Sequence, residues 1–341
     1  MVTLKDIGLR VNRSVTTVSR ALSGCSDVSP DTIQLVQETA KQMGYVPNTL
    51  AQRLQKKSAD TIGIIAPVSS MGYAESFFCE LLAGIGEEAS LQGIDLLVAY
   101  AKEENEMAIY KKLVTGGRVD GFILSRTLRD DPRVNYLSSV QFPFAAFGMV
   151  ENHHDFPYVE EDGEYAMAQL VDHLVGRGHT RIACICPPLS VMFSAVRLRG
   201  VKKRLAELGL ELDPSLVREG SFDQKDGYDQ TNILLDLPNP PTAIIGFNDI
   251  IAFGVINAAK ERGLKIGRDL AVTGFDDIPM ASLYRPPLTT VNQPIHEIGS
   301  MVTRLLLQSI QEKHPKNHHT NSSLEKSQIL LRPNLIIRAS T

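Results

Sequence analysis

Four side chains near the start of the chain have the chemistry needed to read base pairs. Val15, Thr16, Ser19 and Arg20 lie on one side of a predicted helix, opposite its apolar stripe. Short side chains and one long cation suit the base edges exposed in a DNA major groove. This surface predicts sequence-specific recognition of double-stranded DNA.

The elements that position these side chains are short helices. Apolar residues repeat at helical spacing from Leu4 to Val11, Ser14 is a suitable N-cap, and the apolar period then resumes. A third amphipathic helix begins after Ser29. Residues 1–45 are therefore predicted to form a helix-turn-helix headpiece.

Residues 46–60 read as a linker that is too short to hold a helix alone but is patterned to become one when it is ordered. Residues 1–57 contain eight Lys or Arg and four Asp or Glu, a net charge of +4, which leaves −8 for the remainder of the −4 total. Only the N-terminal end is therefore suited to phosphate, and its binding should weaken steeply with salt.

From residue 61 the chain alternates strand and helix in two series, which predicts two lobes of the α/β class, each with a parallel sheet covered by helices. The expected strands are 62–66, 96–99, 119–124 and 142–147, then 181–186, 216–220, 243–247 and 271–275. Ligands bind at the carboxyl ends of such strands. Those ends deliver Ser125, Arg126, Phe222, Asn248, Asp249, Asp276 and Asp277 to one crevice. Its mixture of cation, amide, carboxylate and aromatic ring suits a neutral polyhydroxylated molecule.

Several short motifs, in this order, resemble the lactose-repressor (LacI/GalR) family of bacterial transcription regulators over nearly the whole chain. They are Thr17-Val18-Ser19-Arg20, Tyr45-x-Pro47-Asn48-x-x-Ala51, Arg118-Val119-Asp120-Gly121, Gly178-His179-Thr180-Arg181, Arg197-x-x-Gly200, Gly274-Phe275-Asp276-Asp277 and Pro286-Pro287-Leu288-Thr289-Thr290. The resemblance implies a headpiece joined to a two-lobed, periplasmic-binding-protein-like effector domain. It also implies that the linker becomes a hinge helix in the minor groove, where Leu54 wedges between base steps.

With the resemblance included, the predicted DNA-binding residues lie in the headpiece and the linker. They are Thr3, Leu4, Ser14, Val15, Thr16, Thr17, Ser19, Arg20, Tyr45, Asn48, Ala51, Gln52 and Leu54. The expected partners are a pseudo-palindromic operator DNA, a second copy of the chain in a homodimer, and a small-molecule effector.

The resemblance also implies roles in the cleft. Arg197 would bridge ligand hydroxyls, Asn248 and Asp276 would complete the pocket, and Phe78 and Phe222 would form stacking walls. The predicted ligand-binding set is Phe78, Ser125, Arg126, Arg197, Phe222, Asn248 and Asp276. The alternatives are that Asp276 caps a following segment, that Arg197 is a surface cation, and that Phe78 belongs to the core.

The segment from Leu124 to Phe144 resembles a branch of the family that responds to glucosides and related oligosaccharides. The predicted function is a repressor of carbohydrate-utilisation genes controlled by a sugar. A purine or nucleoside is the rival effector. A solute-binding protein or a sugar-modifying enzyme of the same two-lobed fold is the alternative from another class, but it leaves the basic headpiece and Leu54 unexplained.

The resemblance places three crossings between the lobes near Val159, Thr290 and Ser322, so that helix 295–310 returns to the first lobe. The predicted domains are 1–45 (headpiece), 46–60 (linker), 61–158 with 291–321 (first lobe) and 159–290 with 322–341 (second lobe).

The headpiece departs from the family pattern at Asn12, Arg13 and Gly8, of which Arg13 replaces an apolar residue that normally helps to pin the two helices. Asn12 takes the place of a glycine in the turn, which asparagine tolerates because it adopts the left-handed conformation. Gly8 replaces an alanine in the first helix, at an expected cost of up to about 1 kcal/mol in helix propensity.

Other signals argue against an enzyme, a cofactor, a metal or a membrane. Dinucleotide, P-loop, zinc-protease and serine-hydrolase motifs are absent. Cys184 and Cys186 are predicted to be buried thiols, and His314, His318 and His319 to lie in an exposed loop. The absence of an apolar leader or of 18 consecutive apolar residues leads us to expect a cytoplasmic protein.

Overall fold

The computed structural model of this chain describes residues 2–25, 27–45, 58–67, 75–152, 155–313 and 328–341. The chain forms two compact units, Met1–Ser58 and Ala59–Thr341. Most of the predicted linker, with Asn48, Ala51, Gln52 and Leu54, lies outside the described residues, as do His314, His318 and His319.

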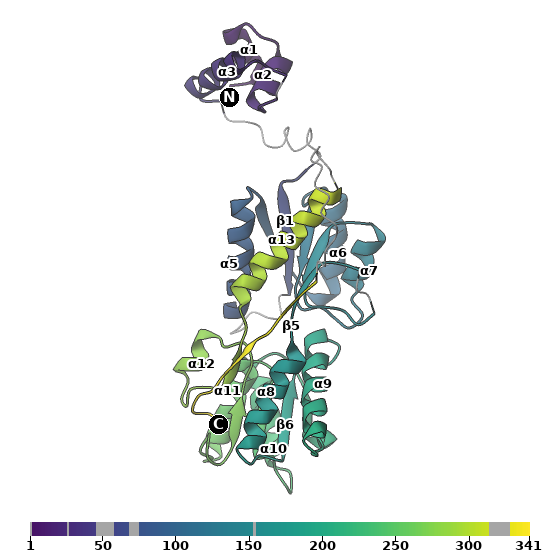
Figure 1. Ribbon diagram of the computed structural model, residues 1–341, viewed down its shortest axis with the longest axis vertical. Helices are drawn as coiled ribbons and strands as arrows, with labels where there is room; N and C mark the ends of the chain where they lie inside the picture. The colour runs from purple at the N-terminus through teal and green to yellow at the C-terminus, as the bar shows by residue number, and fades with distance from the viewer. Residues whose placement is uncertain (1, 26, 46–57, 68–74, 153–154, 314–327) are drawn as a thin grey trace. The chain divides into compact units, whose positions relative to one another are not determined.

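The smaller unit is a three-helix headpiece (Figure 1). Its helices are α1 (Leu4–Val11), α2 (Val15–Leu22) and α3 (Pro30–Gln42). Each begins after a hydroxyl N-cap that accepts a backbone N–H, as predicted for Ser14 and Ser29. The helices enclose a core of Ile7, Val11, Val18, Ala21, Val36 and Ala40. The predicted helix-turn-helix is therefore confirmed.

The turn between α1 and α2 depends on two unusual positions. Asn12 has a φ of +52°, which confirms the left-handed conformation predicted for it. Gly8 is more than a weak helix former, because a Cβ atom there would lie 2.7 Å from the carbonyl oxygen of Arg13. The expectation that Gly8 only weakens the helix was incomplete, since the close approach of the turn requires it.

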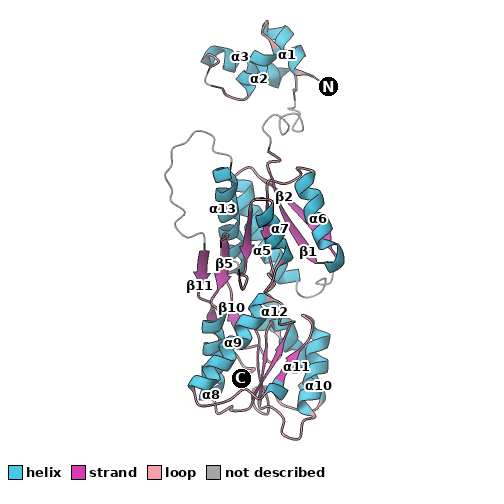
Figure 2. Ribbon diagram, turned by 90° about the vertical axis from the view of Figure 1, so that its right-hand side faces the viewer, coloured by secondary structure: helices cyan, strands magenta, loops and turns pink. Residues whose placement is uncertain are grey.

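The first lobe of the larger unit is built on a six-stranded parallel sheet in the order β11-β5-β4-β3-β1-β2. The strands are β1 (Thr61–Pro67), β2 (Asp95–Ala101), β3 (Gly121–Leu124), β4 (Phe144–Phe147), β5 (Tyr158–Glu161) and β11 (Gln328–Leu331). Helices α5 (Glu75–Leu91) and α13 (Ile295–Lys313) cover one face, and α6 (Glu103–Thr115) and α7 (Pro132–Ser139) cover the other. Figure 2 shows this layering.

The second lobe repeats the design with four parallel strands in the order β7-β6-β8-β9. These are β6 (Ile182–Cys186), β7 (Val217–Glu219, after the short 3-10 helix Pro214–Leu216), β8 (Ala243–Gly246) and β9 (Ala271–Thr273). Helices α8 (Gly163–Gly176) and α9 (Met192–Glu207) pack on one face, and α10 (Gln224–Leu235) and α11 (Asp249–Glu261) on the other. The short helix α12 (Pro279–Leu283) follows β9.

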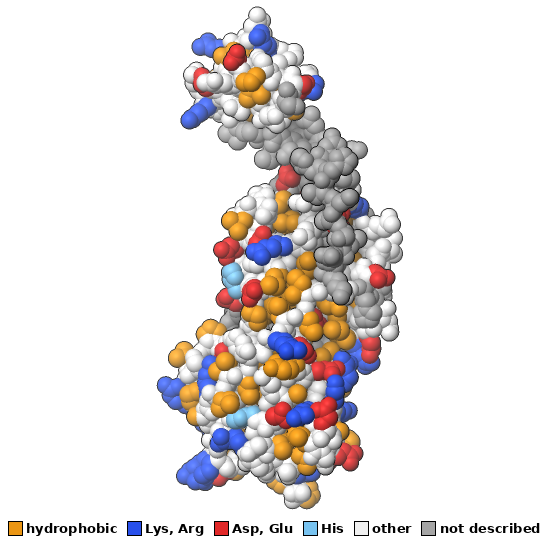
Figure 3. Space-filling view, in the orientation of Figure 1, with side chains coloured by type: hydrophobic (Ala, Val, Ile, Leu, Met, Phe, Trp, Pro, Cys, Tyr) orange, Lys and Arg blue, Asp and Glu red, His pale blue; other side chains and the backbone are white. Residues whose placement is uncertain are grey.

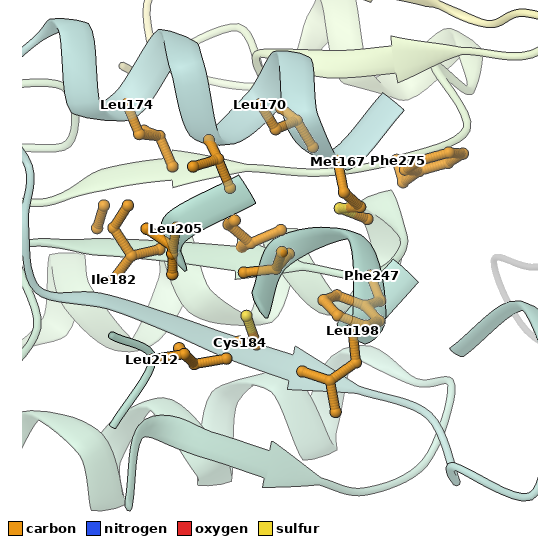
Figure 4. Close-up of a cluster of buried hydrophobic side chains, with 14 of the residues drawn as sticks. Met167, Leu170, Leu174, Ile182, Cys184, Leu198, Leu205, Leu212, Phe247 and Phe275 are labelled. Atoms are coloured by element: carbon orange, nitrogen blue, oxygen red, sulfur yellow. The ribbon is translucent and has the colours of Figure 1, made fainter. Parts of the chain in front are cut away.

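The core between α8, α9 and the second sheet is apolar and contains both strand cysteines (Figure 4). Cys184 and Cys186 are buried on β6, as predicted. Burial raises the pKa of the Cys186 thiol to about 12 and that of Cys184 further still. Both side chains therefore serve as packing groups.

The crossings between the lobes differ from two predicted boundaries. β5 pairs with β4 and β11 pairs with β5, so both strands belong to the first sheet. The predicted boundaries at 158/159 and 321/322 were therefore wrong. The chain leaves the first lobe later in each case, after β5 ends at Glu161 and after β11 ends at Leu331. Consecutive charged residues hid β5, and the polar tract before β11 was assigned to the second lobe. The return of helix 295–310 to the first lobe is confirmed, because α13 packs on its sheet.

A third crossing is formed by β10 (Thr290–Asn292), which pairs antiparallel with β12 (Asn334–Ile336). The prediction of a crossing near Thr290 is thus confirmed. None of the helices among the described residues is long and apolar enough to span a membrane.

Candidate ligand cleft and nucleic-acid interface

The outer face of α2 presents the predicted base-reading residues. Val15, Thr16 and Arg20 are exposed and Ser19 is half-buried, whereas Val18 on the opposite side is fully buried. Lys and Arg side chains are spread over the visible face of the headpiece (Figure 3). The helix therefore offers one long cation and several small side chains to a groove, with an apolar stripe holding it in place.

The remaining headpiece residues of the predicted set also have structural roles. Thr3 caps α1 through a capping box with Asp6, whose pKa is lowered by the hydrogen bonds from Thr3. The Ser14 hydroxyl accepts the N–H of Thr17 at 3.0 Å. Leu4 and Tyr45 are half-buried and pack against the headpiece core. Their side chains fix the scaffold, and the hydroxyls of Thr3, Ser14 and Thr17 remain at the surface.

A cleft of about 1110 Å³, counted with the space at its mouth, lies between the two lobes of the larger unit. The first lobe contributes residues from α5 and from the ends of β3, β4 and β5, and the second contributes residues from α9 and from the loops after β7, β8 and β9. All seven residues of the predicted set line it: Phe78, Ser125, Arg126, Arg197, Phe222, Asn248 and Asp276. The strand-end rule gave five of these residues, and the resemblance gave Phe78 and Arg197, which lie on helices.

Phenyl rings form much of the cleft wall. Phe77 stacks on Phe147 at 6.2 Å between ring centroids, and Phe193 meets Phe222 edge-on at 6.2 Å. The guanidinium of Arg126 lies 5.4 Å from the Phe222 centroid and so joins the two lobes. Of these rings only Phe222, together with Phe78, is predicted from the sequence, because the others occur in segments that read as ordinary core.

Arg197 is a buried residue and not the surface cation considered as its alternative. Only 4% of it is exposed, and its guanidinium lies 3.4 Å from the Phe275 centroid and 4.5 Å from that of Phe193. It pairs with Glu161 and donates a hydrogen bond to the Phe247 carbonyl oxygen at 2.6 Å. Arg197 is therefore held rigidly in the wall before any ligand arrives.

Asp276 and Asn248 are also pre-positioned. Gln293 donates to Asp276 Oδ1 at 2.7 Å, and Asp276 has a φ of +115°, a rare conformation for a residue with a side chain. Asn248 caps α11 by accepting the N–H of Ile251 at 2.7 Å, and it donates to the Phe222 carbonyl oxygen. Each retains free hydrogen-bonding capacity toward the cavity.

Two carboxylates expected in the crevice do not line it. Asp249 is fully buried, accepting from Thr290 Oγ1 at 2.5 Å and from the N–H of Ile278 at 2.9 Å. Asp277 pairs with Arg338 at 2.7 Å. Both tie β-strand ends of the second lobe together, so the prediction that they face the crevice was wrong.

Two buried acids on β5, absent from the predicted set, complete the polar wall. Burial, with a smaller contribution from neighbouring Glu161, raises the pKa of Glu160 to about 7. Burial also raises the pKa of Glu161, although Arg197 opposes the shift. Burial raises the pKa of Asp276 well above its usual range, with Arg197 again acting in the opposite direction. The cleft therefore contains several buried acids whose raised pKa values are all lowered in part by one cation, Arg197.

Three buried polar atoms in this wall lack a hydrogen-bond partner within the described part of the chain. They are Glu161 Oε2, Arg197 Nε and Gln293 Oε1, which are two acceptors and one donor. Such groups are costly when they are left unsatisfied. All three lie beneath the cavity surface, since almost none of their area is accessible.

The lobes also touch directly beside the cleft. Leu128 and Val191 form an isolated antiparallel bridge, flanked by hydrogen bonds from Arg129 N to the Ser190 oxygen and from Met192 N to the Thr127 oxygen, both 2.9 Å. This bridge joins the loop that carries Ser125 and Arg126 to the start of α9, the helix that carries Arg197.

The headpiece and the cleft together define a class: a DNA-reading helical domain attached to a two-lobed ligand-binding domain. Comparison with family models agrees. A model described as "Bacterial regulatory proteins, lacI family" matches residues 3–48, and one for the periplasmic binding protein-like domain matches residues 171–341. The chain belongs to the LacI family of bacterial regulatory proteins, which are DNA-binding transcriptional regulators and not enzymes.

Known proteins share this organisation over their whole length. The HTH-type transcriptional regulator AglR of Rhizobium meliloti is 33% identical, covering 100% of this chain and 94% of the relative. The HTH-type transcriptional repressor CytR of Escherichia coli is 32% identical over 92% and 91%. The Lac repressor dimer bound to operator and the anti-inducer ONPF superposes with a TM-score of 0.81 at 28% identity over 99% and 98%. The complex of the regulator CelR with cellobiose gives 0.76 at 28% identity over all of both chains.

Proposed function

We propose that this regulator is a repressor of carbohydrate-utilisation genes, and that a small sugar bound in the cleft controls its affinity for operator DNA. The observation that carries the proposal is the set of polar side chains that line the cleft, Arg126, Asn248 and Asp276 among them, next to phenyl walls. A hydroxyl group both donates and accepts, so a polyol can bond to the cation, the amide and the carboxyl group together, while its apolar ring face stacks on phenylalanine.

The relatives support the two halves of this proposal separately. CytR is a transcriptional repressor, and CelR has been solved with the disaccharide cellobiose. The rival effector is a purine base, which also stacks on phenyl rings but offers fewer hydroxyl groups to these polar side chains.

Calorimetric titration of the full-length protein with cellobiose, maltose, adenosine and hypoxanthine tests the effector class. The chain has no tryptophan, so heat is a better signal than intrinsic fluorescence. We expect binding of a sugar alone. Binding of only the base or the nucleoside would replace the sugar proposal with the purine one.

The variant Asn248→Asp sharpens this titration. Aspartate keeps the cap on α11 but removes the amide donor and adds a negative charge in the cleft. We expect sugar affinity to fall at least tenfold. Asn239→Asp, at an exposed loop position, makes the same charge change away from the cleft and should bind sugar as the native protein does.

We propose a homodimer as the operator-binding form. Large apolar side chains of the effector unit are exposed at Leu91, Val98 and Tyr100 in the first lobe and at Met280 and Leu283 in the second. Hydrophobic side chains (orange) also gather on the visible face of that unit in Figure 3. A two-fold dimer covers such surfaces and presents two headpieces to a pseudo-palindromic site. Sedimentation measurements should give twice the chain mass of 37.5 kDa.

The hinge residues Asn48, Ala51, Gln52 and Leu54 remain part of this proposal on sequence grounds. Leu54→Ala should weaken binding to a selected operator more than binding to arbitrary DNA, because only operator binding opens the minor groove. Equal losses on both DNAs would contradict the wedge role. Deletion of residues 1–57 should abolish both in a gel-shift assay.

A further inference from the structure

The only ion pair on the described surface of the headpiece involves the residue best suited to read a base. Arg20 Nη2 lies 2.5 Å from Asp27 Oδ2, and the two side chains are 53% and 50% exposed. The pair borders a shallow surface groove, which Arg13, Thr16 and Thr17 also line. An acid thus stands among the side chains of the surface that is expected to meet polyanionic DNA.

The geometry leaves Arg20 able to contact a base. A guanidinium has five N–H donors, and this pair engages the Nη2 end alone. The remaining donors suffice for a bidentate contact with guanine O6 and N7. Guanine O6 and N7 carry only partial negative charge, so Asp27 repels them far less than it repels a phosphate.

A phosphate is a different partner. To bind Arg20, a DNA phosphate must approach a guanidinium that already touches a carboxylate, so it meets a like charge or must displace it. Exposed ion pairs contribute little to folding stability, so stabilisation of the headpiece does not explain this placement. The pair therefore discriminates between the neutral edge of a base and the charged backbone.

We propose that Asp27 is a specificity-determining residue, which holds Arg20 for base contact and prevents it from binding phosphate on arbitrary DNA. The inference rests on the proposed operator binding and assigns a role to an acid that the DNA-binding set did not include. In this role Asp27 increases specificity by lowering the affinity for non-specific DNA.

The test compares Asp27→Asn with Asp31→Asn in the full-length protein. Asp31 is exposed in the first turn of α3 and forms no ion pair with Arg20, so its variant makes the same charge change. An operator is first selected from random duplex DNA with the native protein. Affinities for that operator and for a scrambled duplex are then measured by fluorescence anisotropy between 50 and 200 mM salt.

We expect Asp27→Asn to bind scrambled DNA about eightfold more tightly at 0.1 M salt, with a salt slope steeper by about 0.9, as one added phosphate contact requires. Operator affinity should rise less, so the specificity ratio should fall severalfold. Asp31→Asn should change scrambled-DNA binding less than twofold at an unchanged slope. Asp27→Glu, which keeps the carboxylate, should restore native specificity.

Equal behaviour of Asp27→Asn and Asp31→Asn would overturn the inference and leave only a general charge effect. An unchanged specificity ratio in Asp27→Asn would overturn it as well. Failure of the native protein to select any sequence would instead contradict the proposed operator binding, so the two failures are distinguishable. Far-UV circular dichroism of each variant verifies that the helices are retained.

Discussion

Replacing Arg197 with methionine should show how strongly the free energy of unfolding depends on the charge of this side chain. Methionine approximates the length of the arginine side chain but cannot neutralise Glu161, which is 4% exposed. Removal of one partner of a buried ion pair typically costs about 3–5 kcal/mol, because the other charge stays buried and unpaired. We expect a loss of that size at pH 8.

The loss should depend on pH in a defined direction. Burial already raises the pKa of Glu161, and Arg197 holds that shift in check. Without Arg197 the folded-state pKa rises further, so the folded protein binds a proton that the unfolded chain releases above about pH 4.5. Stability then falls as pH rises through this window, and the variant should be less impaired at pH 5.5 than at pH 8.

Urea unfolding followed by far-UV circular dichroism measures this effect. With a slope of about 2–3 kcal/mol per molar urea, the expected loss lowers the midpoint by about 1–2 M at pH 8. The double variant Arg197→Met/Glu161→Gln should recover part of it, because the stranded Glu161 charge is gone while Asp276 still lacks the cation. An equal loss at both pH values, or no recovery in the double variant, would refute the assignment of the cost to a stranded charge.

Three further variants test other features. Gly8→Ala should destabilise the headpiece by about 1–3 kcal/mol in calorimetry, although alanine has the better helix propensity, because its Cβ would crowd the Arg13 carbonyl. The control Gly86→Ala, where a Cβ meets open space, should be neutral or stabilising. Asn12→Ala should lower the headpiece melting temperature, as expected for about 1 kcal/mol at a left-handed position, and Asn12→Gly should not. Glu160→Gln should remove about 2 kcal/mol of the stability lost between pH 5 and 7, because its pKa is raised from 4.5 to about 7; an unchanged pH profile of urea unfolding would count against that shift.

The fold was predictable because its signals are local. Helix caps at Ser14 and Ser29 mark the headpiece, and buried apolar runs mark the strands of both sheets. β5 lacked such a signal, because Glu160 and Glu161 occupy half of its four positions. Their burial becomes understandable only when the first lobe, α9 and Arg197 come together, and no local pattern contains that information.

The location of the cleft was predictable, but the contacts among its side chains were less so. Strand ends and the family resemblance gave seven of the residues that line the cleft, yet the cations near Arg197 in sequence left a solvated helix face open as an alternative. Phe193 lies one turn before Arg197 on α9, but the partners Phe275 and Glu161 come from distant segments. The same reasoning explains the error at Asp249, whose partner Thr290 lies 41 residues away.

The proposed sugar response has a direct route through the backbone. Asp276 in the cleft is bonded to Gln293, which follows β10 and precedes α13. α13 packs tightly on α5, since a Cβ at Gly84 would lie 2.0 Å from the His296 carbonyl oxygen. α5 in turn carries Phe78 into the cleft. A ligand that moves the Asp276–Gln293 pair therefore acts on two helices in backbone contact, and close-packed elements shift as units and do not absorb the strain.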